Sequence, residues 1–284
     1  MIPAPFEYVA PSSVDEAVQA LAAAGEDAKV LAGGQSLLPV LRMRLAAPSM
    51  IVDLRKVAEM RGVREDGDVL VIGAMTTHYD VQRDALVAEH AALVKEATDT
   101  VADPQVRHRG TFGGAIAHAD PAGDLLAPVL ALEGTLVIAG PRGRRTVGAA
   151  EFFQDFFTTA LEPDELLVEV RLPKHTGWRA HYEKFNRVAQ AWSMVAVAAT
   201  ARTEGGVIKE ARVALTNMGS TPVRATAVEQ ALVGAAANAD VIRAAAAHAA
   251  DGTSPAADGN SDVEYRQHLA RVLTGRAVAA AVGA

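Results

Sequence analysis

The fold is decided by the stretch AGGQSLLP at residues 32–39, taken together with RGTFGGAIAHADPAGD at residues 109–124. The residues Lys29-Val30-Leu31 before the first stretch predict a short buried strand, and Pro39 suits the first turn of a helix that begins near Ser36. A glycine pair after a strand lets backbone N–H groups approach an anion without obstruction by a Cβ. Two such loops, contributed by separate segments, can hold one pyrophosphate between them.

Either glycine pair, taken alone, is also compatible with a plain tight turn. The chain has no GxxxxGK followed by Ser or Thr, and no GxGxxG after its first strand, which excludes a P-loop and a standard Rossmann dinucleotide site. Gln35, Ser36 and Thr111 add side-chain donors beside the glycines. The residues themselves therefore leave both an anion site and two structural turns open.

The composition excludes several further classes. The net charge is -7 without a Lys/Arg run, which argues against a nucleic-acid partner. No apolar stretch is long enough to cross a bilayer, and the beginning MIPAPFEYV lacks the features of a signal peptide, so we expect a cytoplasmic protein. Without cysteine the chain cannot carry a disulfide or a cysteine-ligated iron–sulfur cluster, and its 8 scattered histidines predict no metal site.

The pattern of apolar residues predicts an α+β protein. Helices and strands alternate at first, and after Pro173 consecutive strands are followed by Ala-rich helices. Strands are predicted at 29–31, 51–54, 69–72, 135–139, 166–172, 181–187, 194–202 and 207–215. Helices are predicted to begin after Ser13 and near Ser36, and the stretch from the strand 69–72 to about residue 103 is predicted to be mostly helical. Further helices are predicted at 225–233, 239–250 and 264–284, with an aromatic-rich helical turn at 151–157.

The two glycine stretches, in this order, resemble the FAD-binding stretches of the PCMH-type flavoproteins. Within that group they resemble the FAD-carrying medium subunits of molybdenum hydroxylases, such as aerobic carbon monoxide dehydrogenase and xanthine dehydrogenase. Further matches follow at 53–55, 72–74, 102–107, 165–167 and 182–185, so the resemblance covers nearly the whole chain. It implies a two-subdomain FAD-binding fold, with a βαβ subdomain at 1–56 and a second subdomain at 57–176, followed by a smaller α+β domain (sheet plus helices) at 177–284.

The resemblance also implies which residues contact FAD. The pyrophosphate would lie between two stretches, made of Lys29, Val30, Leu31, Ala32, Gly33, Gly34, Gln35 and Ser36 on one side and Thr111, Phe112, Gly113, Gly114 and Ala115 on the other. The family usually has Asn or Ser where Ala115 stands, so one side-chain hydrogen bond is missing here. Val101 and Leu167 match positions that pack on the cofactor, although the residues alone suggest plain core positions.

Three polar or aromatic residues complete the implied site. Asp124 matches an acid that binds the adenosine ribose hydroxyls, and its alternative is a helix N-cap before Leu125. Lys184 matches a lysine at the pyrimidine end of the flavin, where a cation stabilises the anionic reduced form and raises its potential. Without the resemblance it would be a solvated strand residue. Trp192 aligns with an aromatic position near the isoalloxazine, or else it is a half-buried core aromatic.

Some residues of the second stretch are left without an assigned role. His118 beside Asp120 resembles a catalytic pair, but no nucleophile elbow accompanies it, and we expect these residues to shape the loop. Arg107 and Arg109 suit either a phosphate or a partner subunit. No catalytic residue for substrate turnover is predicted in this chain.

The implied function is that of an electron-transfer subunit of an oxidoreductase. The family holds a molybdenum cofactor on a large subunit and two [2Fe-2S] clusters on a small one, assembles as a dimer of heterotrimers, and passes electrons through FAD to a quinone, a cytochrome, NAD or oxygen. Peripheral membrane association of the complex is compatible with this. Carbon monoxide and an N-heterocycle both stay open as substrates of the complex. The motif AGGQS is closer to that of the N-heterocycle hydroxylases. The rival interpretations are a stand-alone FAD-dependent oxidase and a non-catalytic assembly module.

Overall fold

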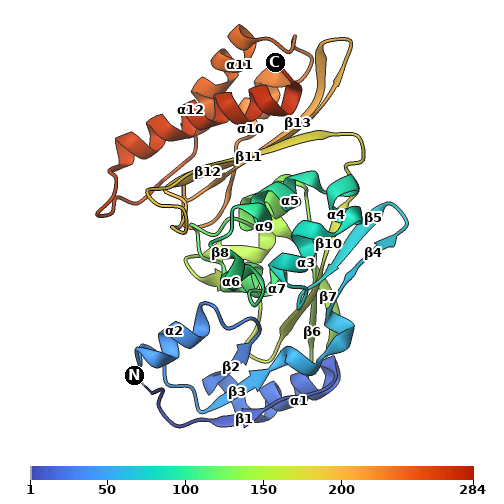
Figure 1. Cartoon of the computed structure of the whole chain (residues 1–284), viewed down its shortest axis with the longest axis vertical. Coiled ribbons are helices and arrows are strands. Elements are labelled where there is room, and N and C mark those ends of the chain that lie inside the picture. The colour runs from blue at the N-terminus through green and yellow to red at the C-terminus, as the bar shows by residue number, and fades with distance from the viewer. Residues whose placement is uncertain (1) are drawn as a thin grey trace.

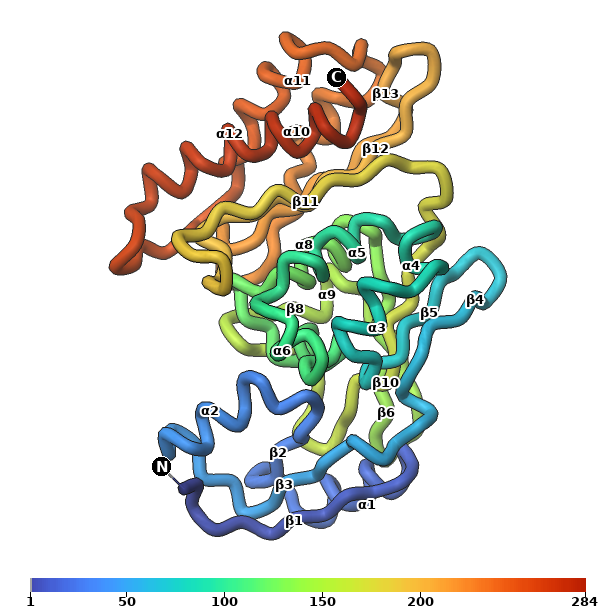
Figure 2. Tube along the Cα trace, in the orientation of Figure 1, coloured from blue at the N-terminus to red at the C-terminus, as the bar shows by residue number. Residues whose placement is uncertain are grey.

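Three β-sheets follow one another along the long axis of the molecule, with helices between and outside them (Figure 1). This computed structural model describes residues 2–284. The chain passes through the three layers in sequence order, so the N-terminus and the C-terminal helices lie toward opposite ends (Figure 2). The mixture of sheets and helices confirms the predicted α+β class. Within the described residues, no helix is both long and apolar enough to cross a membrane.

The first sheet has three parallel strands in the order β1-β3-β2. The elements of this layer are β1 (Glu7–Val9), α1 (Val14–Ala24), η1 (Gly25–Asp27), β2 (Ala28–Leu31), α2 (Leu37–Arg42), β3 (Met50–Asp53), η2 (Leu54–Lys56) and η3 (Ala58–Met60). Helix α1 begins as predicted, because the Ser13 hydroxyl accepts a hydrogen bond from the Glu16 N–H at 3.2 Å. The parallel β2–α2–β3 unit places the first glycine loop, residues 32–36, at the carboxyl end of β2.

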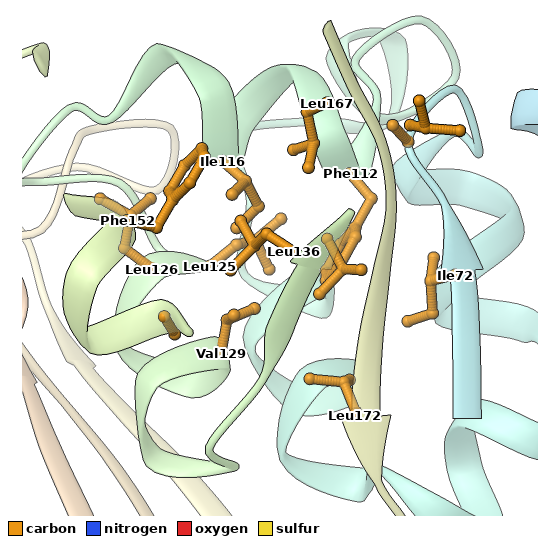
Figure 3. Close-up of a cluster of buried hydrophobic side chains, with 14 of the residues drawn as sticks. Ile72, Phe112, Ile116, Leu125, Leu126, Val129, Leu136, Phe152, Leu167 and Leu172 are labelled. Atoms are coloured by element: carbon orange, nitrogen blue, oxygen red, sulfur yellow. The ribbon is translucent and has the colours of Figure 1, made fainter. Parts of the chain in front are cut away.

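The middle sheet has five antiparallel strands in the order β4-β5-β10-β6-β7. Its strands are β4 (Val63–Asp66), β5 (Val69–Gly73), β6 (Thr135–Gly140), β7 (Gly143–Gly148) and β10 (Leu166–Pro173). The helices of this layer are α3 (His78–Arg83), α4 (Ala85–His90), α5 (Ala92–Asp99), α6 (Pro104–Arg107), α7 (Phe112–His118), α8 (Leu126–Ala131) and α9 (Ala149–Phe152). Figure 3 shows the core that joins them, in which Phe112 and Ile116 of α7 lie near Leu167 of β10.

The last sheet is antiparallel, in the order β11-β12-β13-β14. Its elements are β11 (Arg179–Phe185), β12 (Val195–Glu204), β13 (Val207–Thr216), β14 (Val223–Arg224), α10 (Thr226–Leu232), α11 (Ala239–Ala246), η4 (Ala247–Ala250) and α12 (Val263–Val282). Because successive side chains of a strand point to opposite faces, β12 sends Val195 and Val197 into the core under α12. Its Ala196 and Ala198 instead join the core of the middle layer, so this sheet is covered on both faces.

Two differences from the sequence-based prediction concern short elements. The segment 151–157 is not one helical turn, because α9 ends at Phe152 and the chain continues as β8 (Phe153–Asp155), which pairs with β9 (Thr158–Thr159). The strands β1, β4, β7 and β14 were not predicted. All four lie at the edges of their sheets and are mostly exposed or half-buried, so they lack the apolar run that identifies a buried strand.

Candidate functional site

The two glycine loops lie directly against each other, although they are far apart in the sequence. A Cβ at Gly33 would overlap the carbonyl oxygen of Arg109 and would lie 2.6 Å from the Cα of Gly110. A Cβ at Gly114 would lie 3.2 Å from the Cβ of Ala32. Only glycine at position 33 allows this approach, so the glycines do more than form two independent turns.

The second loop is held by the segment that follows β5. Its residues 110, 112 and 113 share backbone hydrogen bonds of 2.9 Å with His78, Thr76 and Ala74, respectively. A Cβ at Gly113 would lie 2.6 Å from the Cα of Ala74, so this contact also requires a glycine. The loop then enters α7, whose N-cap Thr111 accepts a hydrogen bond from the Gly114 N–H at 3.2 Å. The second glycine pair therefore forms the first turn of a helix.

The first loop leaves hydrogen-bond donors available. Within residues 2–284, the backbone N–H groups of residues 33–36 donate to no acceptor of the chain. Ser36 makes no side-chain capping bond, and the Gln35 amide is exposed and donates to the Gly33 carbonyl at 3.1 Å. Gly34 has a φ of +77°, in the left-handed region that favours glycine. Open N–H groups in a half-exposed loop suit a phosphate, so these residues fit the pyrophosphate of FAD.

A second cluster surrounds the carboxylate of Asp124, which is 5% exposed. Lys184 donates to its Oδ2 at 2.7 Å, while Tyr182 and Ser193 donate to its Oδ1 at 3.0 and 2.8 Å. The Lys184 ammonium also donates to the carbonyl of Thr100 at 3.1 Å. The cluster therefore joins the middle layer, which carries Asp124, to the strand and loop that carry its three donors.

The charges of this cluster respond to burial. Burial raises the pKa of Asp124, and the ion pair with Lys184 and the two hydroxyl donors oppose that shift. Burial is the main cause that raises the pKa of Tyr182 well above its ordinary value, and the charge of Asp124 adds to it. The Tyr182 hydroxyl therefore stays protonated and acts as a hydrogen-bond donor to Asp124. The helix N-cap alternative for Asp124 is wrong, because α8 begins after Leu125 without a side-chain cap. The solvated alternative for Lys184 is also wrong, since only 6% of its side chain is exposed.

The ion pair brings together two residues for which the resemblance implies different contacts with FAD. The adenosine ribose and the pyrimidine end of the flavin are separate parts of FAD, whereas Asp124 and Lys184 are bonded to each other. All three hydrogen bonds to Asp124 come from this chain, which leaves its carboxylate engaged. The two residues therefore form one buried ion pair, and the contacts with FAD that the resemblance implies for each of them stay predictions.

The remaining predicted residues lie around these two clusters. Val101 follows Thr100 and accepts a hydrogen bond from Arg107 through its carbonyl, at 2.7 Å. Leu167 is 5% exposed and belongs to the core shown in Figure 3. Trp192 is 56% exposed, so the core alternative for this residue is wrong. Lys29 is exposed on β2, while Val30, Leu31 and Ala115 are half-buried.

Sequence reasoning missed three polar residues of the Asp124 cluster. Tyr182 and Ser193 donate to the carboxylate, and Thr216 lies within 3.5 Å of the Tyr182 hydroxyl. Tyr182 and Lys184 are two residues apart on β11, so their side chains lie on the same face of the strand. This spacing is the sequence feature that places the two residues in one cluster. The pairing with Asp124 has no local signal.

The pair His118 and Asp120 forms no catalytic arrangement. Burial lowers the pKa of His118, and its ring packs against Phe157 with a centroid distance of 5.1 Å. Asp120 accepts a hydrogen bond from the Ala122 N–H at 2.9 Å, which shapes the turn after α7. Both residues therefore contribute to the shape of the second stretch, as predicted.

Comparison with known proteins agrees with this geometry. Residues 4–175 match the family described as FAD binding domain in molybdopterin dehydrogenase, and residues 180–281 match the carbon monoxide dehydrogenase flavoprotein C-terminal domain. The fold and its paired glycine loops thus define an FAD-binding component of an oxidoreductase. The chain belongs to the FAD-carrying medium subunits of the carbon monoxide dehydrogenase and xanthine dehydrogenase family.

Individual relatives match over their whole length. The carbon monoxide dehydrogenase medium chain of Hydrogenophaga pseudoflava is 42% identical over 284 residues, which cover 99% of this chain and 98% of that protein. The nicotine 6-hydroxylase medium subunit of Paenarthrobacter nicotinovorans is 34% identical, with 96% of each chain covered. A solved structure of the Hydrogenophaga pseudoflava carbon monoxide dehydrogenase gives a TM-score of 0.97 at 44% identity, covering 100% of this chain and 99% of that chain.

Proposed function

We propose that this chain receives electrons within a molybdenum hydroxylase complex and passes them on through a bound FAD to an external acceptor. The observation that carries the proposal is the direct contact of the two glycine loops, beside backbone N–H groups that have no acceptor in the described chain. Bound FAD supplies the redox chemistry, while the protein binds it, orients it and tunes its potential. This agrees with the absence of cysteine, because any iron–sulfur cluster of the pathway then belongs to another polypeptide.

The predicted residues take the following proposed roles. The first loop holds the pyrophosphate through its open backbone N–H groups, and the first turn of α7 closes the other side of the site. Lys184, fixed by Asp124, presents its cation to the pyrimidine end of the flavin. The apolar contacts with the cofactor are proposed for Val101, Leu167 and Trp192, and the exposed indole is available to cover the ring.

The partners are proposed from the relatives. Those relatives are medium chains or subunits by name, which favours a multi-subunit complex over a stand-alone oxidase. We infer a large subunit with the molybdenum cofactor and a small subunit with two [2Fe-2S] clusters, assembled as a dimer of heterotrimers in the cytoplasm. The solved Hydrogenophaga pseudoflava enzyme is described as a form that lacks the Mo-pyranopterin moiety of its molybdenum cofactor, which supports a molybdenum-dependent partner.

Carbon monoxide is the first substrate to test. Identity over the whole chain is 42% to a carbon monoxide dehydrogenase medium chain and 34% to the nicotine 6-hydroxylase subunit. The short motif AGGQS favours an N-heterocycle as substrate. The match to the carbon monoxide dehydrogenase medium chain carries more weight, because it covers the full length of the chain. An N-heterocycle such as nicotine or quinoline is the second candidate.

The proposed function is tested by purifying the chain from its native host through an affinity tag. We expect a large and a small subunit to copurify, with molybdenum and iron, and the flavin absorbance to bleach when the correct substrate is added. Bleaching by carbon monoxide and not by N-heterocycles would assign the substrate, and the reverse result would assign the other class. A flavin-containing chain that oxidises a substrate without partners would contradict the proposal and favour the stand-alone oxidase.

A further inference from the structure

Three buried polar atoms without a hydrogen-bond partner among residues 2–284 belong to α3 and α6, behind the second glycine loop. They are Nδ1 of His78, Oε1 of Gln82 and Nε of Arg107. His78 and Gln82 lie one turn apart on α3 and share a face, and Arg107 is the last residue of α6, which packs against α3. A buried polar atom that makes no hydrogen bond is costly, so such atoms are usually satisfied by protein or by a bound water.

His78 is in direct contact with the second glycine loop. Its backbone N–H donates to the Gly110 carbonyl at 2.9 Å, and a Cβ at Gly110 would lie 2.8 Å from the Cδ2 of its ring. The next residue, Tyr79, stacks on His108, which directly precedes this loop, with a centroid distance of 3.9 Å. The first residues of α3 therefore help to fix the position of the second glycine loop through these two contacts.

Arg107 connects the same cluster to the Lys184 site. Its guanidinium donates to the Val101 carbonyl at 2.7 Å, and the neighbouring Thr100 carbonyl accepts the hydrogen bond from Lys184. The residues that follow Arg107 lead straight into the contact between Arg109 and Gly33. A displacement of Arg107 would thus reach both parts of the predicted cofactor site.

The hydrogen-bonding capacities of the three atoms are complementary. Burial, with a smaller contribution from the nearby Arg107 charge, lowers the pKa of His78 to about 4, so the ring is neutral at pH 7 and one of its nitrogens is an acceptor. The Nε–H of Arg107 can only donate, and the Oε1 of Gln82 can only accept. These capacities match those of one water molecule, which can accept from Arg107 and donate to Gln82 and to Nδ1 of His78.

We propose that a single buried water joins His78, Gln82 and Arg107, and that His78 is a positioning residue that keeps the second glycine loop in its FAD-binding shape. The inference rests on the proposed function in one respect, namely that FAD is the ligand of the loop. It adds a residue and a bound water outside the predicted contact set. His78 acts through Gly110 and Arg107 and does not touch the cofactor.

The test uses the full chain in its native assembly, stripped of flavin and titrated with FAD. In His78→Phe an aromatic ring is kept and the hydrogen bond is lost, so we expect the FAD dissociation constant to rise about tenfold. His78→Asn places a polar atom near the position of Nδ1 and should restore most of the affinity. Gln82→Leu should weaken FAD binding in the wild-type background and add little to His78→Phe, because both changes break the same network.

His90 provides a matched control, because it is a second buried histidine, on α4, hydrogen-bonded to the Thr176 hydroxyl at 2.7 Å. His90→Phe should lower stability without changing the FAD dissociation constant. A wild-type dissociation constant in His78→Phe and Gln82→Leu, or an equal loss of affinity in His90→Phe, would overturn the positioning role. If His78→Phe does not fold, His78→Asn and Gln82→Leu decide the question.

Two further outcomes separate the parts of the inference. A high-resolution crystal structure of the wild-type protein should show a water density peak bonded to the three atoms, and an empty space there would overturn the water. Failure of the wild-type chain itself to take up FAD would overturn the proposed function. By contrast, normal uptake by both the wild type and the His78 variants would overturn only this inference.

Discussion

At the scale of single residues, the predicted cofactor site depends on positions where a side chain cannot be added. Gly33 is the clearest of them, because its Cα faces the backbone of Arg109 and Gly110 and leaves no room for a Cβ. The backbone there cannot move aside without separating the two loops. Other glycines of the chain, such as Gly148, face open space and have no such constraint.

We predict that Gly33→Val abolishes FAD retention, because the branched side chain forces the two loops apart. Flavin content per chain, measured by absorbance after gel filtration, checks this, and circular dichroism shows whether the fold persists. Gly148→Ala is the matched control, since a Cβ at Gly148 meets nothing within 4 Å, and it should keep full flavin content. Normal flavin content in folded Gly33→Val would remove the pyrophosphate from this contact.

Lys184→Met is predicted to destabilise the chain by about 3 kcal/mol, because it leaves the Asp124 carboxylate buried without its counter-ion. Urea unfolding measures the loss, and the flavin midpoint potential of the variant should also fall. The double variant Asp124→Asn/Lys184→Met should recover part of the stability. Lys95→Met, which removes a half-exposed i,i+4 ion pair with Asp99, should change the free energy of unfolding by less than about 0.5 kcal/mol.

His78 is predicted to make stability depend on pH. Its pKa is about 4 in the folded chain and about 6.5 in the unfolded chain, so between these values the unfolded chain binds the additional proton. Stability therefore falls as the pH drops below 6.5 toward 4, by up to about 1.4 kcal/mol per pH unit from this group. His78→Phe should show a shallower loss between pH 7 and pH 5 in urea unfolding, and an unchanged slope would contradict the assignment.

At the scale of secondary structure, helix ends follow local rules that can be tested separately from the cofactor. The α1 N-cap Ser13 accepts the Glu16 N–H as predicted, but the Glu16 carboxylate returns to Ser12 and not to Ser13. The reciprocal bond of a capping box is thus displaced by one residue. Helix α1 packs mainly against β2, β3 and β6, so its start is remote from the contact between the glycine loops.

Replacing Ser13 by alanine should cost about 1 kcal/mol of stability, because the Glu16 N–H loses its capping acceptor. Thermal unfolding followed by circular dichroism is the measurement, and flavin content should remain that of the wild type. A fall in flavin content comparable to that of Gly33→Val would mean that the first sheet and the cofactor site are coupled more tightly than the contacts indicate.

Secondary structure was predictable where burial imposes a pattern. The strands 69–73, 135–140 and 166–173 carry apolar runs that the sequence shows directly. The strands β1, β4, β7 and β14 were missed because each lies at the edge of its sheet with mostly exposed or half-buried residues, so its sequence carries no apolar run. The aromatic segment 151–157 was misassigned because Phe152 and Phe153 are buried through two different elements, a helical turn and a strand.

At the scale of the whole molecule, the candidate site combines segments that only the fold brings together. Both glycine loops were predicted from the sequence because their glycines stand out locally. Their mutual contact and the Asp124–Lys184 ion pair depend on the packing of separate layers. Sequence resemblance named both charged residues and assigned them to different parts of FAD, but neither position predicts that the two side chains form an ion pair of 2.7 Å.

The same ion pair ties the two family domains into one unit. Asp124 lies within residues 4–175, whereas Lys184, Tyr182 and Ser193 lie within residues 180–281. The sheet of the second domain also covers the helices of the first, with β12 contributing to both cores. The C-terminal domain therefore supplies part of the environment predicted for the flavin.

The central claim is that the two glycine loops together hold one FAD, and the most direct measurement is the absorbance spectrum of the protein purified in its native assembly. We predict flavin bands and a ratio close to one FAD per chain, with the flavin released by denaturation identified as FAD by mass. A colourless chain that cannot be reconstituted with FAD would contradict the claim, and the loops would then be structural turns.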